Sequence, residues 1–231
     1  MSRAAKVGWV VDAQVDFMDP DGRLYVKDLF SDTDPGCVRM IPTLERAVTW
    51  MKAHCDVMVF TSDWHHLDDD EIDPVAPDPA KETYPPHCMG RSDDPTERAG
   101  AEIIAEIRPL DPMDLHIDAT EEDARTLARL AVAEGRPIRI LKNRFDVFIG
   151  NPATSALLLE LEQALGRTLE FIVAGVARDV CVTQAVDGMQ SRDYAVTALR
   201  DATWGLGLEA EDATLARWSA RGRVLTVDAL D

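Results

Sequence analysis

The sequence predicts an α/β fold built on a mainly parallel sheet of six strands. Short apolar runs alternate along the chain with segments of helical periodicity, which is the order that βαβ units produce. Charged residues end several of these runs, as expected where the strands of a parallel sheet reach a ligand-binding edge. With 231 residues the chain is long enough for one well-filled core and short for two, so we expect a single domain over residues 1–231.

The six strand-like runs are short and apolar, and they lie at residues 8–11, 57–61, 138–142, 169–173, 195–199 and 224–227. Helical patterns occupy residues 41–54, 99–107, 120–134, 152–165, 180–191 and 209–220. Thr120 precedes three acidic residues and Asn151 precedes Pro152, and both arrangements are signals of a helix start. Residues 19–35 and 67–98 are rich in Asp and Pro, and loops of that length are usually functional or flexible.

Composition narrows the class of function. The chain has 42 acidic and 24 basic residues and a formal net charge of −18, which argues against binding a nucleic acid or an anionic membrane. No apolar run approaches the roughly 20 residues of a membrane-spanning helix, and no signal peptide is recognisable. We therefore expect a soluble, cytoplasmic protein that acts on a small molecule. The four cysteines are far apart in sequence, so we expect free thiols.

Cys181 is the first candidate for a reactive group. It lies where the predicted strand at 169–173 gives way to a helix, and a thiol near a helix N-terminus is favoured as a thiolate. Asp12 and Lys142 each end an apolar run, so a parallel sheet would bring all three to one edge. The alternative is structural: Cys181 as inert packing, Asp12 as a loop-binding carboxylate and Lys142 as its surface partner.

Asp63, His65 and His87 are candidate metal ligands. Asp63 and His65 are two residues apart, so an extended segment points both side chains to the same side, and His87 is the natural third ligand. One carboxylate and two imidazoles suit zinc first, with iron or manganese as other candidates. The acidic residues 69–71 are close enough in sequence to supply another ligand. The alternative is that all of these are polar residues of a solvated loop.

Taken together, these segments resemble the isochorismatase-like cysteine hydrolases, and within that superfamily the nicotinamidases. The resemblance covers most of the chain and follows the family order. It is carried by residues 10–17 (VVDAQVDF), 63–65 (DWH), 86–88 (PHC), 100–102 (GAE), Lys142, 175–182 (GVARDVCV) and 200–202 (RDA).

The resemblance implies a doubly wound α/β fold with helices on both faces and a catalytic triad of Cys181, Asp12 and Lys142. It implies a cis peptide bond at Val176–Ala177, which would direct the backbone N–H groups of Ala177 and Cys181 to an oxyanion hole. The implied reaction is amide hydrolysis through a thioester, with nicotinamide converted to nicotinate and ammonia.

The resemblance also assigns the metal to Asp63, His65 and His87, and it places Phe17 against the substrate ring. Tyr84 stands where nicotinamidases usually have tryptophan, and its hydroxyl needs a partner. This departure, with the altered residues 89–98, leaves two alternatives open: another amide or ureido substrate, or a non-catalytic member that binds a ligand.

The segment at residues 108–136 is longer than the link that this family usually has before the lysine strand. It would either cover the site or form a contact in the homo-oligomer that we expect.

Overall fold

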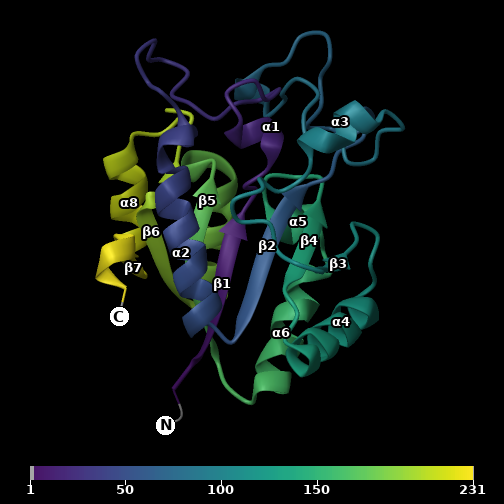
Figure 1. The fold of residues 1–231 in the computed structure, drawn as a ribbon, viewed down its shortest axis with the longest axis vertical. Coiled ribbons are helices and arrows are strands. Elements are labelled where there is room, and N and C mark those ends of the chain that lie inside the picture. Colours follow the sequence, from purple (N-terminus) through teal and green to yellow (C-terminus); the bar gives the residue numbers. More distant parts are fainter. Residues whose placement is uncertain (1–2, 231) are drawn as a thin grey trace.

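One parallel sheet organises the chain (Figure 1). The computed structural model describes residues 3–230, and within them seven strands lie in the order β3-β4-β2-β1-β5-β6-β7. Every neighbouring pair in this order is parallel, which confirms the predicted α/β sheet. The strands are β1 (Ala5–Val11), β2 (Val57–Asp63), β3 (Met113–Leu115), β4 (Ile138–Lys142), β5 (Leu169–Val176), β6 (Ala195–Trp204) and β7 (Arg223–Leu225).

The prediction of six strands was one short, because it missed β3 at the sheet edge. This strand has three residues, of which only Leu115 is buried, so it is too short to show the alternation by which a strand is recognised. With the helix α4 (Glu121–Glu134) it occupies most of residues 108–136. That segment extends the sheet beside β4 and packs on α6 (Thr154–Leu165), and it does not line the cavity described below.

Helices cover both faces of the sheet, as the doubly wound fold requires. On one face the core forms around Trp9 and Phe171 of the sheet, under α4, α6, α7 and α8. On the other face α2 packs over Phe60 and Ile172. The helices are α1 (Val15–Met18), α2 (Ile41–His54), α3 (Pro95–Gly100), α4 (Glu121–Glu134), α5 (Val147–Gly150), α6 (Thr154–Leu165), α7 (Thr183–Ser191) and α8 (Glu211–Ser219).

The predicted helix at residues 99–107 was wrong for most of its length, because α3 ends at Gly100. The next residues pair with the segment after β1 instead. Glu102 accepts a hydrogen bond from the N–H of Val15 (2.9 Å), and Ile104 donates one to Ala13 (3.0 Å). These long-range bonds occupy backbone groups that a helix would have needed.

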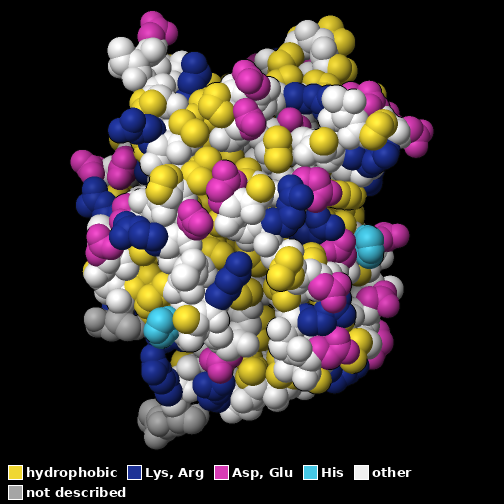
Figure 2. Space-filling model, in the orientation of Figure 1, with side chains coloured by type: hydrophobic (Ala, Val, Ile, Leu, Met, Phe, Trp, Pro, Cys, Tyr) yellow, Lys and Arg dark blue, Asp and Glu magenta, His cyan; other side chains and the backbone are white. Residues whose placement is uncertain are grey.

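Strand order reverses between β1 and β5, and ligands of such sheets bind beyond the carboxyl ends of the strands at this point. Two largely irregular segments, residues 19–36 and 64–94, rise above those ends (Figure 1) and form the two projections at the top of the space-filling view (Figure 2). On the face shown in Figure 2, Lys and Arg side chains are interspersed with Asp and Glu. Among residues 3–230, no helix is both long and apolar enough to cross a bilayer.

Candidate active site

A small cavity lies at the carboxyl ends of the central strands, where the strand order reverses. Its volume is about 20 Å³, which is room for about one water molecule. The thiol of Cys181 lies at the cavity, together with Asp63 and His87. The other walls are mainly apolar, and their side chains are Phe17, Leu24, Val26, Phe145, Val180 and Leu206.

The structure brings Asp12, Lys142 and Cys181 together, and all three are buried. Asp12 directly follows β1, and its Oδ2 lies 2.9 Å from Nζ of Lys142, the last residue of β4. Thr61 of β2 donates a hydrogen bond of 2.6 Å to the other oxygen, Oδ1. The sulfur of Cys181 and carboxylate oxygens of Asp12 and Asp63 all lie within 4.8 Å of one another. The convergence expected from the strand ends is therefore present.

Burial controls the charge of this cluster. Burial raises the pKa of Asp12 above its ordinary value, although Lys142 partly offsets the effect. Burial also raises the pKa of Cys181 well above its ordinary value, and Lys142 again offsets only part of it. Burial opposes the charge of Lys142, but Asp12 and Asp63 hold its pKa well above the ordinary range. The resting pair is therefore a thiol beside an ammonium group.

The pKa of Cys181 is not lowered, although the helix start was expected to favour the thiolate. Cys181 does lie in a π-helical turn (Arg178–Val182) that leads into α7, as the helix-start argument supposed. However, the thiol is also buried near Asp12, Asp63 and Glu71, and each of these carboxylates raises its pKa. Burial among negative charges outweighs the backbone N–H groups of the helix start.

The backbone before Cys181 has the form that the resemblance implied. The peptide bond Val176–Ala177 is cis. Gly175 has φ of 126°, and a side chain there would collide with the backbone of Val11, so this position requires glycine. Ala177 and Cys181 both line the cavity, one before the π-helical turn and one within it.

Asp63, His65 and His87 form a buried set whose ligand atoms lie within 4.8 Å of one another. Oδ2 of Asp63, at the end of β2, is 3.7 Å from Nε2 of His65 and 3.9 Å from Nε2 of His87. Nδ1 of His65 donates to Asp69 (3.2 Å), and Nδ1 of His87 donates to the carbonyl of Pro85 (2.7 Å). Both rings are thereby oriented with Nε2 toward Asp63, as metal-binding histidines commonly are.

The residues fit a divalent metal. Oδ2 of Asp63 and Nε2 of His65 are buried and have no hydrogen-bond partner among the described residues. Burial alone would lower the pKa of His65, but the nearby carboxylates of Asp63 and Asp69 raise it to about 9, so a positive charge is favoured between these residues. Because Oδ1 of Asp63 accepts a close hydrogen bond from Lys142, Asp63 faces the ammonium with one oxygen and the imidazoles with the other.

Three adjacent acidic residues, which the sequence left as equal candidates for a further ligand, have different surroundings. Asp69 orients His65, and Asp70 is exposed in an ion pair with an arginine. Glu71 is buried, and its Oε1 accepts a hydrogen bond of 2.8 Å from the N–H of Phe145. Its Oε2 is buried without a partner among residues 3–230, and burial together with Asp63 raises the pKa of Glu71 to about 7.

Phe17 and Tyr84 both line the cavity. The ring of Phe17 lies 5.2 Å from the ring of His87, and the ring of Tyr84 meets Phe145 edge-on at 5.4 Å. Burial raises the pKa of Tyr84 to about 12. Within the described chain, the hydroxyl of Tyr84 has no hydrogen-bond partner. It is thus a polar group in an otherwise apolar wall.

Sequence reasoning missed the residue that holds Asp63. Gln14 is fully buried; its Oε1 accepts the N–H of Asp63 (2.8 Å), and its Nε2 donates to the carbonyls of Asp63 and Ala101 (2.8 Å each). Gln14 lies two residues after Asp12, beyond the end of the strand, and this position at the ligand-binding edge is the signal that could have identified it. The apolar walls contributed by Leu24 and Leu206 left no comparable signal in the sequence.

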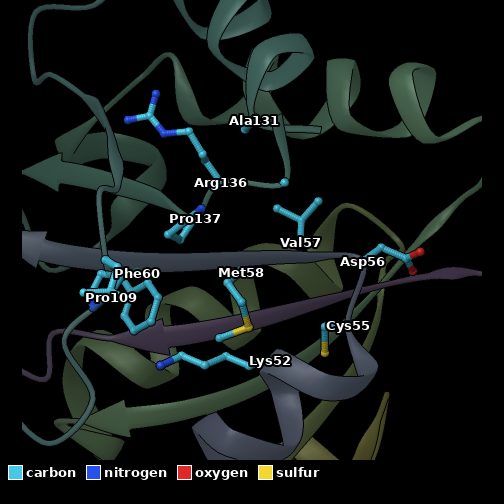
Figure 3. A pocket seen from close by; sticks show the side chains of 12 residues that line it. Lys52, Cys55, Asp56, Val57, Met58, Phe60, Pro109, Ala131, Arg136 and Pro137 are labelled. Atoms are coloured by element: carbon cyan, nitrogen blue, oxygen red, sulfur yellow. The ribbon is translucent and has the colours of Figure 1, made fainter. Parts of the chain in front are cut away.

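A larger groove of about 330 Å³ lies elsewhere, between the end of α2 and β2 (Figure 3). Met58 and Phe60 of β2 lie along it, with Lys52 and Arg136 on opposite sides. The guanidinium group of Arg136 donates a hydrogen bond of 3.1 Å to the carbonyl of Asp111. Within residues 3–230, the groups that could hold a metal converge at the smaller cavity and not at this groove.

Comparisons with known proteins agree with this fold. The family model described as Isochorismatase domain matches residues 9–229, whereas a search of curated proteins found no match. Among solved structures, PnC1 of L. infantum in complex with nicotinate is 21% identical with a TM-score of 0.67, and the match covers 100% of this chain and 97% of that one.

Two further structures are similar. The pyrazinamidase of Pyrococcus horikoshii in complex with zinc is 22% identical with a TM-score of 0.61, covering 96% of this chain and 98% of that one. The N-carbamoylsarcosine amidase of Thermoplasma acidophilum is 18% identical with a TM-score of 0.63, covering 98% and 99%. These likenesses concern the fold, and the match to the family model covers nearly the whole chain. The chain therefore belongs to the isochorismatase family.

Proposed function

We propose that the protein is an amidohydrolase that cleaves a small uncharged carboxamide through Cys181, with nicotinamide as the first candidate substrate. One observation carries the proposal. A buried thiol lies within 4.8 Å of carboxylate oxygens of Asp12 and Asp63, and both carboxylates contact Lys142. A nucleophile that lines the cavity thus lies beside a base and a fixed positive charge, which is the arrangement that covalent amide hydrolysis requires.

In the first half of the reaction, Asp12 takes the proton of the Cys181 thiol, and the thiolate attacks the carboxamide carbon. The raised pKa of Asp12 makes it a stronger base than an exposed aspartate, and Lys142 stabilises the negative charge. The backbone N–H groups of Ala177 and Cys181 would donate to the developing oxyanion. Asp12 then returns the proton to the departing nitrogen, which leaves as ammonia, and a thioester to Cys181 remains.

In the second half, water replaces ammonia. Asp12 takes a proton from the water, whose oxygen attacks the thioester carbon. Collapse of the intermediate breaks the carbon–sulfur bond, and the proton on Asp12 restores the Cys181 thiol. The products are a carboxylic acid and the free enzyme, so one amide and one water are consumed for each ammonia released.

Asp63, His65 and His87 would hold a divalent metal, with zinc as the first candidate. When bound, such an ion supplies a positive Lewis-acid centre for a substrate heteroatom or a water molecule. The support from this chain is the pair of unpartnered donor atoms described above. The zinc complex of the P. horikoshii pyrazinamidase is consistent with this choice. Elemental analysis of protein purified without added metal would test it.

The cavity supports an uncharged substrate. Apart from Asp63 and His87, its lining side chains carry no charge, and Lys142 is buried against two carboxylates. A carboxylate on the substrate would therefore lose its hydration without gaining a counter-charge from a lining lysine or arginine. Phe17 and Tyr84 offer aromatic surface to a flat ring. Because the cavity holds about one water molecule, its walls must move apart to admit such a ring.

The hydroxyl of Tyr84 favours a second candidate, namely an amide or ureido compound with a further polar group. Tyr84 lines the cavity and, among residues 3–230, its hydroxyl is free to bond, so a polar atom of the substrate could form a hydrogen bond with it. The cavity and the reaction would be unchanged, and only the substrate would differ.

Ammonia release from nicotinamide tests the proposal most directly, with pyrazinamide, a ureido compound and a carboxylate-bearing amide assayed alongside. We expect kcat/KM above about 10⁴ M⁻¹s⁻¹ for the preferred substrate, with the carboxylate-bearing amide the poorest. Activity only toward the ureido compound would support the second candidate.

A non-catalytic member would hydrolyse none of these compounds. Its Cys181 would also be alkylated at the same rate after Asp12→Asn as before. In the proposed enzyme, Asp12→Asn should slow that alkylation, because the buried thiol loses its base.

A further inference from the structure

We infer that Asp16 is a positioning residue for the metal site: its buried carboxylate holds the backbone of Cys88, and this backbone in turn places both His65 and His87. The inference rests on the proposed function, because it concerns the metal set assigned there. It adds a residue that lies outside that set and outside the catalytic triad.

The side chain of Asp16 reaches from α1 to the loop that carries the histidines. Asp16 is only 4% exposed, and its Oδ2 accepts a hydrogen bond of 2.7 Å from the backbone N–H of Cys88. Its Oδ1 accepts a longer bond of 3.3 Å from the N–H of Arg23. A buried carboxylate with backbone donors on both oxygens has a defined orientation.

The backbone of Cys88 connects the two histidines. His87 precedes Cys88 directly, so the torsion angles there set the direction of His87. The carbonyl of Cys88 accepts a hydrogen bond of 2.9 Å from the N–H of His65. Fixing Cys88 therefore fixes the backbone under both imidazoles.

Cys88 has a conformation that needs support. Its φ is 45°, in the left-handed region that residues other than glycine seldom occupy. Such conformations persist where the surroundings over-determine them. The bond from its N–H to Asp16 and the bonds from the N–H groups of His65 and Gly90 (2.7 Å) to its carbonyl supply those surroundings.

Gly100 closes the remaining side of the carboxylate. A Cβ added to Gly100 would collide with the carboxylate group of Asp16, so α3 packs its bare backbone directly against that group. Asp16 thus joins α1, the histidine loop and α3 at one point. Gly100→Ala offers a way to displace the carboxylate without removing it.

The test measures binding of zinc alone, by competition with a chromogenic chelator, in the full-length wild type, Asp16→Ala and Asp16→Asn. We expect Asp16→Ala to weaken zinc binding about 10- to 100-fold, as loss of a group that orients metal ligands typically does. Asp16→Asn should retain most of the affinity, because its amide oxygen can still accept from Cys88. At saturating zinc, Asp16→Asn should recover the wild-type kcat.

Asp73→Ala is the matched control. Asp73 lies in segment 64–94, which also carries His65 and His87. Like that of Asp16, its carboxylate accepts hydrogen bonds from two backbone N–H groups, those of Val75 and Ala76 at 2.9 Å each. Its removal should leave zinc affinity within about twofold of the wild type. Circular dichroism and thermal melting show whether each variant is folded. If Asp16→Ala does not fold, Gly100→Ala decides: displacement of the carboxylate should weaken zinc binding, and zinc affinity within twofold of the wild type would overturn the inference.

The possible failures are distinguishable. Folded Asp16→Ala that binds zinc as tightly as the wild type would overturn the role of Asp16 and leave the proposed function intact. A wild type that binds no zinc would overturn both this inference and the assigned metal set. A wild type that binds zinc but hydrolyses no amide would refute the proposed reaction, while weakened zinc binding in Asp16→Ala would still support the positioning role.

Discussion

The site has two halves that are held in different ways. The triad half, Asp12, Lys142 and Cys181, lies at the carboxyl edge of the sheet, at the ends of β1 and β4 and in the turn after β5. The metal half, Asp63, His65 and His87, takes one residue from the end of β2 and two from the long irregular segment 64–94. The sheet thus places the groups proposed for proton transfer, and a loop places most of the proposed ligands.

Charge separates the halves as well. Burial raises the pKa of Asp12. Burial also acts to raise the pKa of Asp63, but Lys142, His65 and His87 together hold it well below its ordinary value. Both carboxylates are buried at the ends of adjacent strands and both contact the same ammonium group. The difference shows that two neighbouring buried carboxylates can serve different purposes. The raised pKa of Asp12 suits a base, and the lowered pKa of Asp63 suits a metal ligand.

Cys181→Ala should produce the largest effect, and it falls on the triad half alone. Without the sulfur no thioester can form, so turnover should drop by at least about 10⁴-fold. Zinc content and melting temperature should stay near wild type, because the metal half does not use this residue. Ammonia release and elemental analysis measure the two outcomes, and substantial residual activity would exclude the covalent route.

Lys142→Met tests the residue that joins the halves. The substitution keeps much of the side-chain volume but leaves Asp12 and Asp63 facing each other without a counter-charge. Breaking a buried ion pair in this way typically costs about 3 to 5 kcal/mol of unfolding free energy. Urea denaturation measures the loss, with the exposed Lys52→Met as control. An unchanged midpoint would mean that the ammonium group does not stabilise the cluster.

His87→Ala should separate the halves. Zinc affinity should fall by at least about 100-fold, since a ligand matters no less than the groups that orient it. Alkylation of Cys181 should keep its wild-type rate, because the triad half is intact. His66→Ala is the control, since His66 lies in the same segment, 64–94, but its side chain is exposed. Normal zinc stoichiometry and affinity in His87→Ala would remove His87 from the ligand set.

Tyr84→Phe should have the smallest effect and should sharpen the assignment of substrate. For nicotinamide we expect kcat/KM to change by less than about threefold, because the aromatic wall is kept. For a substrate that accepts a hydrogen bond from the hydroxyl, the loss should reach about tenfold, the value of one neutral hydrogen bond. Comparison of the two substrates in both proteins measures the difference. Equal losses would show that the hydroxyl does not discriminate between them.

Much of the triad half could be predicted from sequence, because its residues follow apolar runs directly. The metal half was less predictable: Asp63 and His65 form a local pattern, but Gln14 and Asp16, which hold their surroundings, act across 49 and 72 positions of the chain. Residues 101–107 have helical periodicity and yet pair with the segment after β1. Local pattern cannot report a competing partner that is remote in sequence.

The sequence by itself determined the parallel α/β sheet and the edge at which Asp12, Lys142 and Cys181 meet, because strand periodicity is local and parallel strands share a direction. Tertiary structure alone decided the state of those groups. It made Cys181 a thiol, raised the pKa of Asp12, and distinguished buried Glu71 from exposed Asp70. The reason is that a pKa depends on burial and on neighbouring charges, and both are set by segments that only the folded chain brings together.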